Sequence, residues 1–224
     1  MWAAGPSQKG WAADQGQMLA EVWTVVEKLQ ARYRKTKDLQ ADFTQSTRIE
    51  GFATPLTSSG RVYIKKPGKL RWDYREPSVE EIYVDEDTVN IYVPEHQQVL
   101  VGDLTKMTAS RAPLQLLQGM ANLEEQFRIV PTDGAARGAG GLALVTLLPK
   151  PGEHGSDQNR RKIVLEVQPK TYFLKTVSIH DATGNVSTFA FSNLRPNTGL
   201  SDNVFRFRVP PGVEVVKAPE LGGP

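Results

Sequence analysis

Residues 39–95 decide the fold, and three segments within them alternate apolar and polar side chains: LQADFTQ (39–45), SSGRVYIKKPGKLRWDYREP (58–77) and EEIYVDEDTVNIYVPE (80–95). In the second segment, Leu70, Trp72 and Tyr74 alternate with charged residues. Successive side chains of a strand point to opposite faces of a sheet. The alternation therefore predicts antiparallel strands with one apolar face and one charged face.

Four short turn motifs separate these strands: Lys66-Pro67-Gly68, Glu76-Pro77-Ser78, Asp85-Glu86-Asp87 and Pro94-Glu95-His96. Val99 and Val101 continue the alternation after the last of these turns. Strand patterns resume in the second half of the chain, over residues 126–130, 142–148, 162–167, 173–180, 186–194 and, briefly, 204–207. A Gly/Ala-rich stretch (132–141) and a polar stretch (149–161) are predicted to be hairpin tips. Together the patterns predict about eleven strands.

Two regions have helical patterns. Residues 17–37 place apolar side chains on one stripe at a spacing near 3.6: Met18, Val22, Val25, Val26, Leu29 and Tyr33. Asp14 and Gln17 are predicted to form a capping box at its start. Residues 104–123 predict one or two short helices, with Pro113 near a start. The fold class expected is α+β, mainly β: an unclosed antiparallel barrel with an N-terminal helix and a mid-chain helical lid.

Composition narrows the function classes. The 224 residues include 27 basic and 25 acidic side chains, and this near balance argues against a nucleic-acid partner. There is no cysteine, which excludes disulfides, thiolate metal sites and an acylated cysteine in this sequence. Residues 1–16 lack an apolar core, so they are expected to be a disordered leader or cloning remnant, with any signal peptide removed. Residues 17–217 form the predicted domain, and 218–224 a flexible tail.

Motifs for catalysis are missing. The histidines, at positions 96, 154 and 180, stand apart in the sequence, and no Gly-x-Ser-x-Gly motif occurs. The glycines at 134–141 are not followed by Lys-Ser or Lys-Thr, so they do not form a phosphate loop. The acidic run at 85–87 lies in a turn and is too short for a calcium loop. We therefore expect no enzyme, no metal site and no cofactor.

The ordered segments of residues 39–95, the Ala112-Pro113-Leu114 motif and the ending FRFRVPPGVEVV (205–216) resemble the LolA family of lipoprotein carriers over about residues 17–217. The resemblance implies a periplasmic carrier that works without a cofactor, as a monomer. It would accept acylated lipoproteins from an inner-membrane ABC transporter of the Lol type. It would then pass them to an outer-membrane acceptor lipoprotein.

The same resemblance implies a site. Acyl chains would lie against apolar residues of the strands and the lid: Phe43, Val62, Ile64, Leu70, Trp72, Tyr74, Ile82, Val84, Ile91, Val93, Met107, Leu114 and Leu117. Lys66 stands where the family usually has an arginine that latches the lid, and lysine lacks the planar guanidinium fork. Two alternatives stay open. One is a protein of the same fold that binds another lipid or senses a partner, and the other is an enzyme on this scaffold.

Overall fold

The computed structural model describes residues 8–103, 117, 122–150 and 162–217. Helix α1 (Gln8–Lys35) comes first. The strands are β1 (Asp38–Arg48), β2 (Leu56–Lys65), β3 (Lys69–Glu76), β4 (Glu80–Asp85), β5 (Thr88–Val93), β6 (Gln98–Asp103), β7 (Phe127–Pro131), β8 (Val145–Pro149), β9 (Lys162–Val167), β10 (Leu174–His180), β11 (Val186–Pro196) and β12 (Glu214–Lys217). Short helical turns lie between them: η1 (Pro94–His96), α3 (Leu123–Gln126), η3 (Asp133–Ala135) and η5 (Asp202–Phe205).

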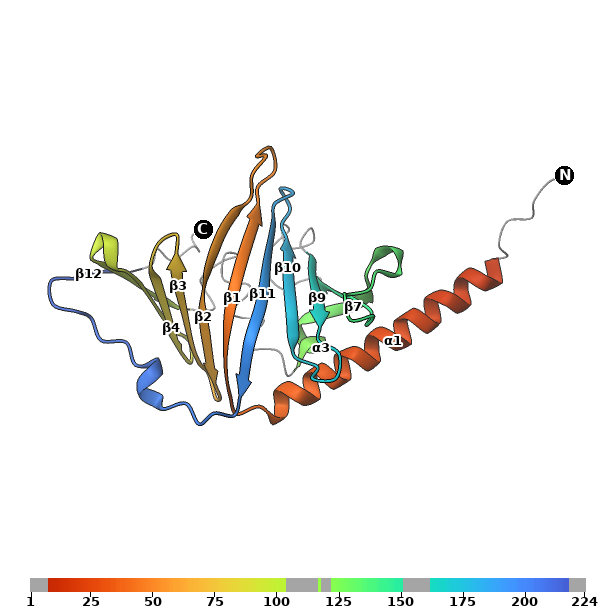
Figure 1. The fold of residues 1–224 in the computed structure, drawn as a ribbon, viewed down its shortest axis with the longest axis horizontal. Coiled ribbons are helices and arrows are strands. Elements are labelled where there is room, and N and C mark those ends of the chain that lie inside the picture. The colour runs from red at the N-terminus through yellow and green to blue at the C-terminus, as the bar shows by residue number, and fades with distance from the viewer. Residues whose placement is uncertain (1–7, 104–116, 118–121, 151–161, 218–224) are drawn as a thin grey trace.

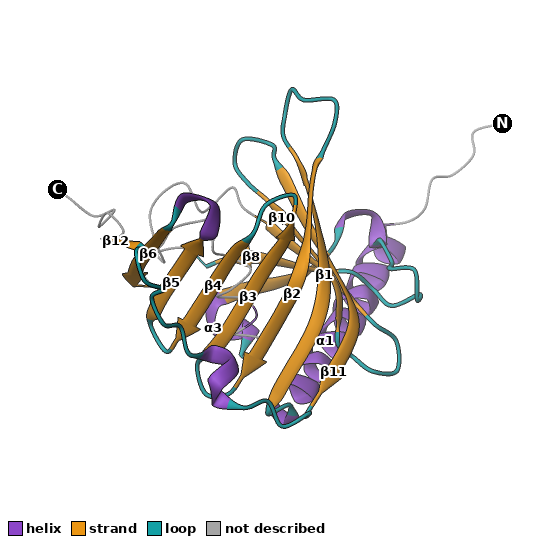
Figure 2. Cartoon of the chain, turned by 60° about the vertical axis from the view of Figure 1, so that its left-hand side comes forward, coloured by secondary structure: helices purple, strands orange, loops and turns teal. Residues whose placement is uncertain are grey.

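One sheet contains all twelve of these strands, in the order β12-β6-β5-β4-β3-β2-β1-β11-β10-β9-β8-β7. Strand β1 lies near the middle because it pairs with both β2 and β11. Neighbours are antiparallel, except that β12 runs parallel to β6. Strands β12 and β7 are the two edges, so the sheet is unclosed, and it curves with α1 and α3 on the same side (Figure 2). The predicted architecture is confirmed, with twelve strands in place of about eleven.

The four predicted turns are confirmed, because each joins two neighbouring antiparallel strands between β2 and β6. Residues 132–144 connect β7 to β8, as the glycine-rich stretch predicts. The polar stretch connects β8 to β9, although its residues 151–161 lie outside the described part of the chain. Of the mid-chain helical region, only residue 117 and residues from 122 onward are described.

Helix α1 is longer than predicted. Its apolar stripe is confirmed, since all members are buried except Met18, which is half-buried. The helix begins at Gln8, so the prediction of a disordered leader is wrong for residues 8–16, and the Asp14–Gln17 capping box is wrong because α1 runs through both residues. Once a docked stripe fixes the first turns, each added residue costs little, and alanine and glutamine favour helix. Figure 1 shows these first turns projecting past the sheet.

The main core lies on the face of the sheet that α1 and α3 cover, called the inner face below. Its buried side chains come from α1 and from strands on both sides of β1, and they form one continuous cluster. Burying such a side chain contributes about 1.5–3 kcal/mol. Because β1 joins the two halves of the sheet, the inner face is continuous from β5 to β8.

Residues 197–213, called the C-terminal strap below, run from the end of β11 to β12 along the base of the sheet (Figure 1). The predicted strand over residues 204–207 is wrong, because Asp202–Phe205 form the 3-10 turn η5. Ser201 caps this turn, with its Oγ accepting from the Asn203 N–H at 3.3 Å. Strand β12 was not predicted, since most of its side chains are exposed and show no alternation in polarity.

Candidate functional site

Two rows of paired apolar residues cross the inner face of β2–β5. In the first row, Val62 lies opposite Trp72, which lies opposite Ile82, and the row continues to Ile91. The second row is Ile64, Leu70, Val84 and Val89. Apart from Ile64, which is half-buried, all of these side chains are buried. The alternation of apolar and polar residues in the sequence therefore predicted correctly that these residues share one face of the sheet.

The other predicted site residues are less uniform. Phe43 and Leu117 are buried in the main cluster, and Tyr74 is half-buried against it. Val93 is half-buried at the end of β5. Met107 and Leu114 lie outside the described residues, so their part of the predicted lid is not placed. An acyl-binding role for this set stays a prediction.

An aromatic cluster forms the centre of the inner face. Trp72 contacts Phe43 at a ring-centroid distance of 4.6 Å and Phe189 at 5.6 Å, and Phe191 lies 6.3 Å away. Tyr74 packs edge-on against Phe43 at 5.1 Å. Sequence reasoning missed the two β11 phenylalanines, although they alternate in a predicted strand. The missing information was the pairing of β1 with β11, which brings together residues far apart in the chain.

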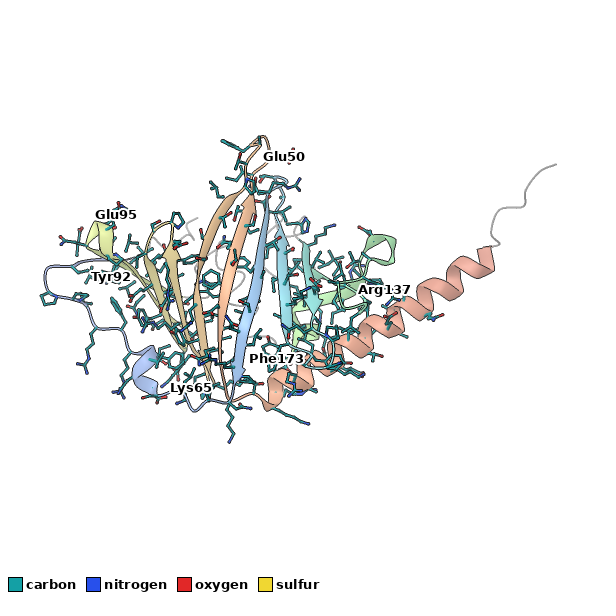
Figure 3. All side chains as sticks on the ribbon, in the orientation of Figure 1. Glu50, Lys65, Tyr92, Glu95, Arg137 and Phe173 are labelled. Carbon is teal, nitrogen blue, oxygen red and sulfur yellow. The ribbon has the colours of Figure 1, made fainter. Side chains whose placement is uncertain are left out.

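Helix α1 and the short helix α3 are tied together over the inner face by one amide side chain. Gln30 is buried; its Nε2 donates to the Glu124 carboxylate at 2.7 Å and its Oε1 accepts from the Leu123 N–H at 2.9 Å. Farther along α1, Tyr33 packs edge-on against Phe173 with ring centroids 5.5 Å apart. Phe173 lies just before β10, next to the helix (Figure 3). Burial raises the pKa of Tyr33, so its hydroxyl stays neutral.

Lys66, the predicted latch, contacts helix α1. Its Nζ donates a hydrogen bond to the backbone carbonyl of Tyr33, in the last turn of the helix. The same carbonyl accepts from the Thr36 N–H at 3.2 Å, and the lysine cation interacts favourably with the negative end of the helix dipole. Burial, together with the nearby positive charge of Arg34, lowers the pKa of Lys66. The structure thus places this lysine on α1, while a latch to the mid-chain helix stays a prediction.

The outer face of β3 and β4 carries a charged and aromatic cluster beneath the C-terminal strap. Arg71 donates to the Asp73 carboxylate at 2.7 Å and to the Val204 carbonyl at 3.4 Å, so it joins the sheet to the strap. Its guanidinium lies 4.9 Å from the ring centroid of Tyr83, which packs on Phe207 at 5.1 Å. Burial raises the pKa of Asp73, although the hydrogen bond from Arg71 opposes this shift.

Asp38, at the start of β1, anchors the other end of the strap. Its carboxylate accepts hydrogen bonds from the Thr198 N–H at 2.7 Å, the Gly199 N–H at 3.0 Å and the Thr198 hydroxyl at 3.1 Å. Burial alone would raise the pKa of this carboxyl, but the hydrogen bonds outweigh it and the pKa lies below its usual value. Lys65 adds an ion pair to Asp202 of η5 at 2.6 Å, at the base of the sheet in Figure 3.

The described residues hold no cluster of three or more histidine, cysteine or carboxylate side chains that could bind a metal ion. His96 lies in η1 and His180 on β10, far apart in the sheet order, and residue 154 is outside the described part. Among the described helices, none is long and apolar enough to cross a membrane. The inner face of β2–β5 is apolar and carries few hydrogen-bonding side chains, which suits the binding of hydrocarbon.

Comparisons with known proteins agree with this reading. Residues 34–208 match the family model described as outer membrane lipoprotein carrier protein LolA. The outer-membrane lipoprotein carrier protein of Methylobacillus flagellatus is 30% identical over 201 residues, covering 87% of this chain and 91% of the relative. That of Dechloromonas aromatica is 30% identical over 191 residues, covering 85% and 86%. An uncharacterized conserved protein from Thermus thermophilus shares the fold, with a TM-score of 0.53 at 14% identity over 88% of this chain and 98% of that one.

Proposed function

Because the chain belongs to the LolA family of outer-membrane lipoprotein carriers, we propose that it binds the acyl chains of lipoproteins on its inner face and carries them through the periplasm. It receives its cargo from an inner-membrane ABC transporter of the Lol type and delivers it to an outer-membrane acceptor lipoprotein. It acts as a monomer and performs no catalysis.

The observation that carries this proposal is the continuous apolar inner face. An acyl chain of some 16 carbons costs on the order of 13 kcal/mol to expose to water, at about 0.8 kcal/mol per methylene. The rows on β2–β5 and the aromatic cluster offer a broad apolar surface to replace that water. Dispersion and burial are non-directional, so such a face binds chains without fixing their path and can release them without an energy source.

Lys66 supports the carrier role as a releasable contact. The Lys66 ammonium makes one hydrogen bond to the end of α1, at a Tyr33 carbonyl that also accepts from the Thr36 N–H at 3.2 Å, so losing this contact leaves the carbonyl paired. An arginine would have offered several donors in a rigid fork. The lysine therefore gives a weaker hold on the helix, which favours exchange of cargo.

A transfer assay tests the function. Inner-membrane vesicles containing the Lol-type transporter and a triacylated lipoprotein are incubated with the purified protein and ATP, and lipoprotein released as a soluble complex is measured. The complex is then mixed with outer-membrane vesicles. We expect release and then transfer. An intact, folded protein that leaves the lipoprotein on the membrane would refute the proposal.

Two neighbouring residues of β6 provide a matched pair of variants. Leu100 packs against the inner cluster, while Val101 points to the outer face, and both are half-buried. Leu100→Gln should reduce soluble complex formation severalfold, because it places an amide on the acyl-binding face. Val101→Gln should release lipoprotein like the wild type. Circular dichroism melting curves of both variants show whether either has lost its fold.

A further inference from the structure

The indole N–H of Trp72 is an unpaired donor at the centre of the inner face. Trp72 is 1% exposed, and its Nε1 has no hydrogen-bond partner among the described residues. Buried polar atoms in folded proteins are nearly always paired, so an exception calls for a specific explanation. A phenylalanine would have filled an apolar wall without this cost.

The rings around Trp72 do not replace an oxygen acceptor. Phe189 packs edge-to-face with the indole at 5.6 Å and Phe43 is tilted by 50° against it, so these rings offer the N–H at most a π face. Aromatic faces accept N–H groups only weakly. The donor therefore lies in an apolar, low-dielectric setting, where a carbonyl oxygen would form a strong hydrogen bond with it.

Polar groups begin one step farther along the same face, toward the hairpin tips. The Tyr74 hydroxyl donates to Gln45 Oε1 at 2.7 Å, and Gln45 Nε2 donates to the Thr47 hydroxyl at 3.1 Å. The Thr47 and Ser187 hydroxyls lie 3.0 Å apart. These four residues are called the hydroxyl–amide ladder below. Each is half-buried, and none carries a charge.

Tyr74 connects the aromatic cluster to the hydroxyl–amide ladder. Its ring packs on Phe43 within the aromatic cluster, while its hydroxyl begins the ladder. Phe43 and Gln45 are two residues apart on β1, which places them on the same face of the sheet. The inner face therefore changes from apolar to polar within about 7 Å along the strand. An acyl ester also changes from hydrocarbon to polar head over a similar length.

On the carrier function proposed above, we infer that Trp72 Nε1–H donates a hydrogen bond to the ester carbonyl of a bound glyceryl-linked acyl chain. The hydrocarbon lies on the aromatic cluster and the apolar rows beside it. The hydroxyl–amide ladder receives the uncharged glyceryl and peptide head. Trp72 is thus a positioning residue that fixes how far the chain enters and which end points to the hairpin tips.

The charges near the ladder favour an uncharged head over an anionic one. Glu80 lies opposite Tyr74 on β4 and is half-buried, so it adds a carboxylate near the ladder. None of the four ladder side chains is cationic, so a phosphate there would gain no ion pair with them. An ester-linked lipopeptide, whose head is uncharged, is therefore the preferred ligand.

Two synthetic ligands test the hydrogen bond. Both are N-acetylated S-glyceryl-cysteine peptides; one carries two palmitoyl esters and the other two hexadecyl ethers, which lack the carbonyls. We expect the wild type to bind the ester about fivefold to tenfold more tightly than the ether, the contribution of one buried hydrogen bond. Replacing Trp72 by β-(3-benzothienyl)alanine, which keeps the ring shape but has no N–H, should abolish this preference while ether binding is retained.

A spectroscopic readout and a control variant separate the hydrogen bond from general packing. In ¹⁵N-labelled protein, the Trp72 indole proton should shift downfield with the ester and not with the ether. Trp23, which is exposed on α1, serves as the control, and Trp23→Phe should keep the ester preference. An ester preference that survives the benzothienyl replacement would overturn the inference.

The outcomes also separate this inference from the proposed function. If the wild type binds both peptides equally, the Trp72 assignment fails while the carrier function stands. If it binds neither peptide, the carrier function fails and the inference fails with it. Dipalmitoyl phosphatidylglycerol is the third ligand, and tighter binding of this anionic lipid than of the ester peptide would overturn the assignment of an uncharged head to the ladder.

Discussion

Replacing Asp38 should loosen the C-terminal strap and destabilise the whole protein. The side chain is 6% exposed and accepts three hydrogen bonds from Thr198 and Gly199. Hydrogen bonds to a charged group contribute about 1.5–3 kcal/mol each, but they share one carboxylate and water can reach part of the loop, so they do not add fully. We expect Asp38→Ala to lower the free energy of unfolding by about 3 kcal/mol. Asp38→Asn, which keeps one acceptor oxygen, should lower it by about 1–2 kcal/mol.

The pH dependence gives a second check on the same carboxylate. Its folded-state pKa lies below the unfolded value of about 3.9, so the folded state favours the ionised form. The stabilisation is then fully present above that unfolded value and is lost as the pH falls through the folded-state pKa. Urea unfolding followed by far-UV circular dichroism should show a constant difference between wild type and Asp38→Ala from pH 8 to about pH 5. The difference should shrink at lower pH.

The exposed Asp87, in the turn between β4 and β5, provides the control for this experiment. Asp87→Ala should change the free energy of unfolding by no more than about 0.5 kcal/mol. If Asp38→Ala were as mild as this control, or if its effect were the same at pH 3 and pH 7, the assignment of Asp38 as the anchor of the strap would be wrong.

Substitutions of Gly60, Lys66 and Phe205 probe three other parts of the fold. Gly60→Ala should lower the free energy of unfolding in urea by about 3 kcal/mol, because a Cβ there would lie 1.9 Å from the Asp73 carbonyl oxygen. As a control, Gly16→Ala meets nothing within 4 Å and should raise helix stability by up to about 1 kcal/mol. Equal effects of the two changes would contradict this. Lys66→Met should cost about 1–2 kcal/mol by removing the charged hydrogen bond to the Tyr33 carbonyl, which then keeps the Thr36 N–H at 3.2 Å. Lys66→Arg should restore the contact, as thermal melts of the two variants can show. Phe205→Ala should lower the free energy of unfolding by about 3 kcal/mol and speed proteolysis within the strap, because Phe205 is buried. If the strap were cut at the wild-type rate, its packing on the outer face would be wrong.

Local patterns predicted the elements of the fold well, because alternation and turn chemistry act over a few residues. Trp72 and its row were placed on the inner face from parity alone. The alternation predicted the wrong face for β6: Val99 and Val101 lie on the outer face, while Leu100 between them faces inward. Apolar residues occupy both faces of this strand, so the sequence pattern does not show which face carries the main core.

Long-range pairings were beyond the reach of these local patterns. Phe189 and Phe191 reach the aromatic cluster only because β11 returns to pair with β1. Asp38 could be recognised as an anchor only once residues 198 and 199 lay beside it. The entropy cost of closing the loops between such contacts depends on the topology of the whole sheet. No single segment of the sequence shows that topology.

On the carrier function proposed above, the positions of α1 and the C-terminal strap allow the inner face to exchange acyl chains without unfolding. Helix α1 contacts β7 and β8 on the inner face, whereas η5 contacts β3 and β4 on the outer face. Tyr83 of β4 and Phe205 of the strap are both buried, and neither belongs to the main inner cluster. Contacts on the outer face are therefore kept when the inner rows of β2–β5 change partners. Since the strap is tied to β1 through Asp38, weakening that anchor should loosen the half of the sheet that carries these rows before it affects the half beneath α1.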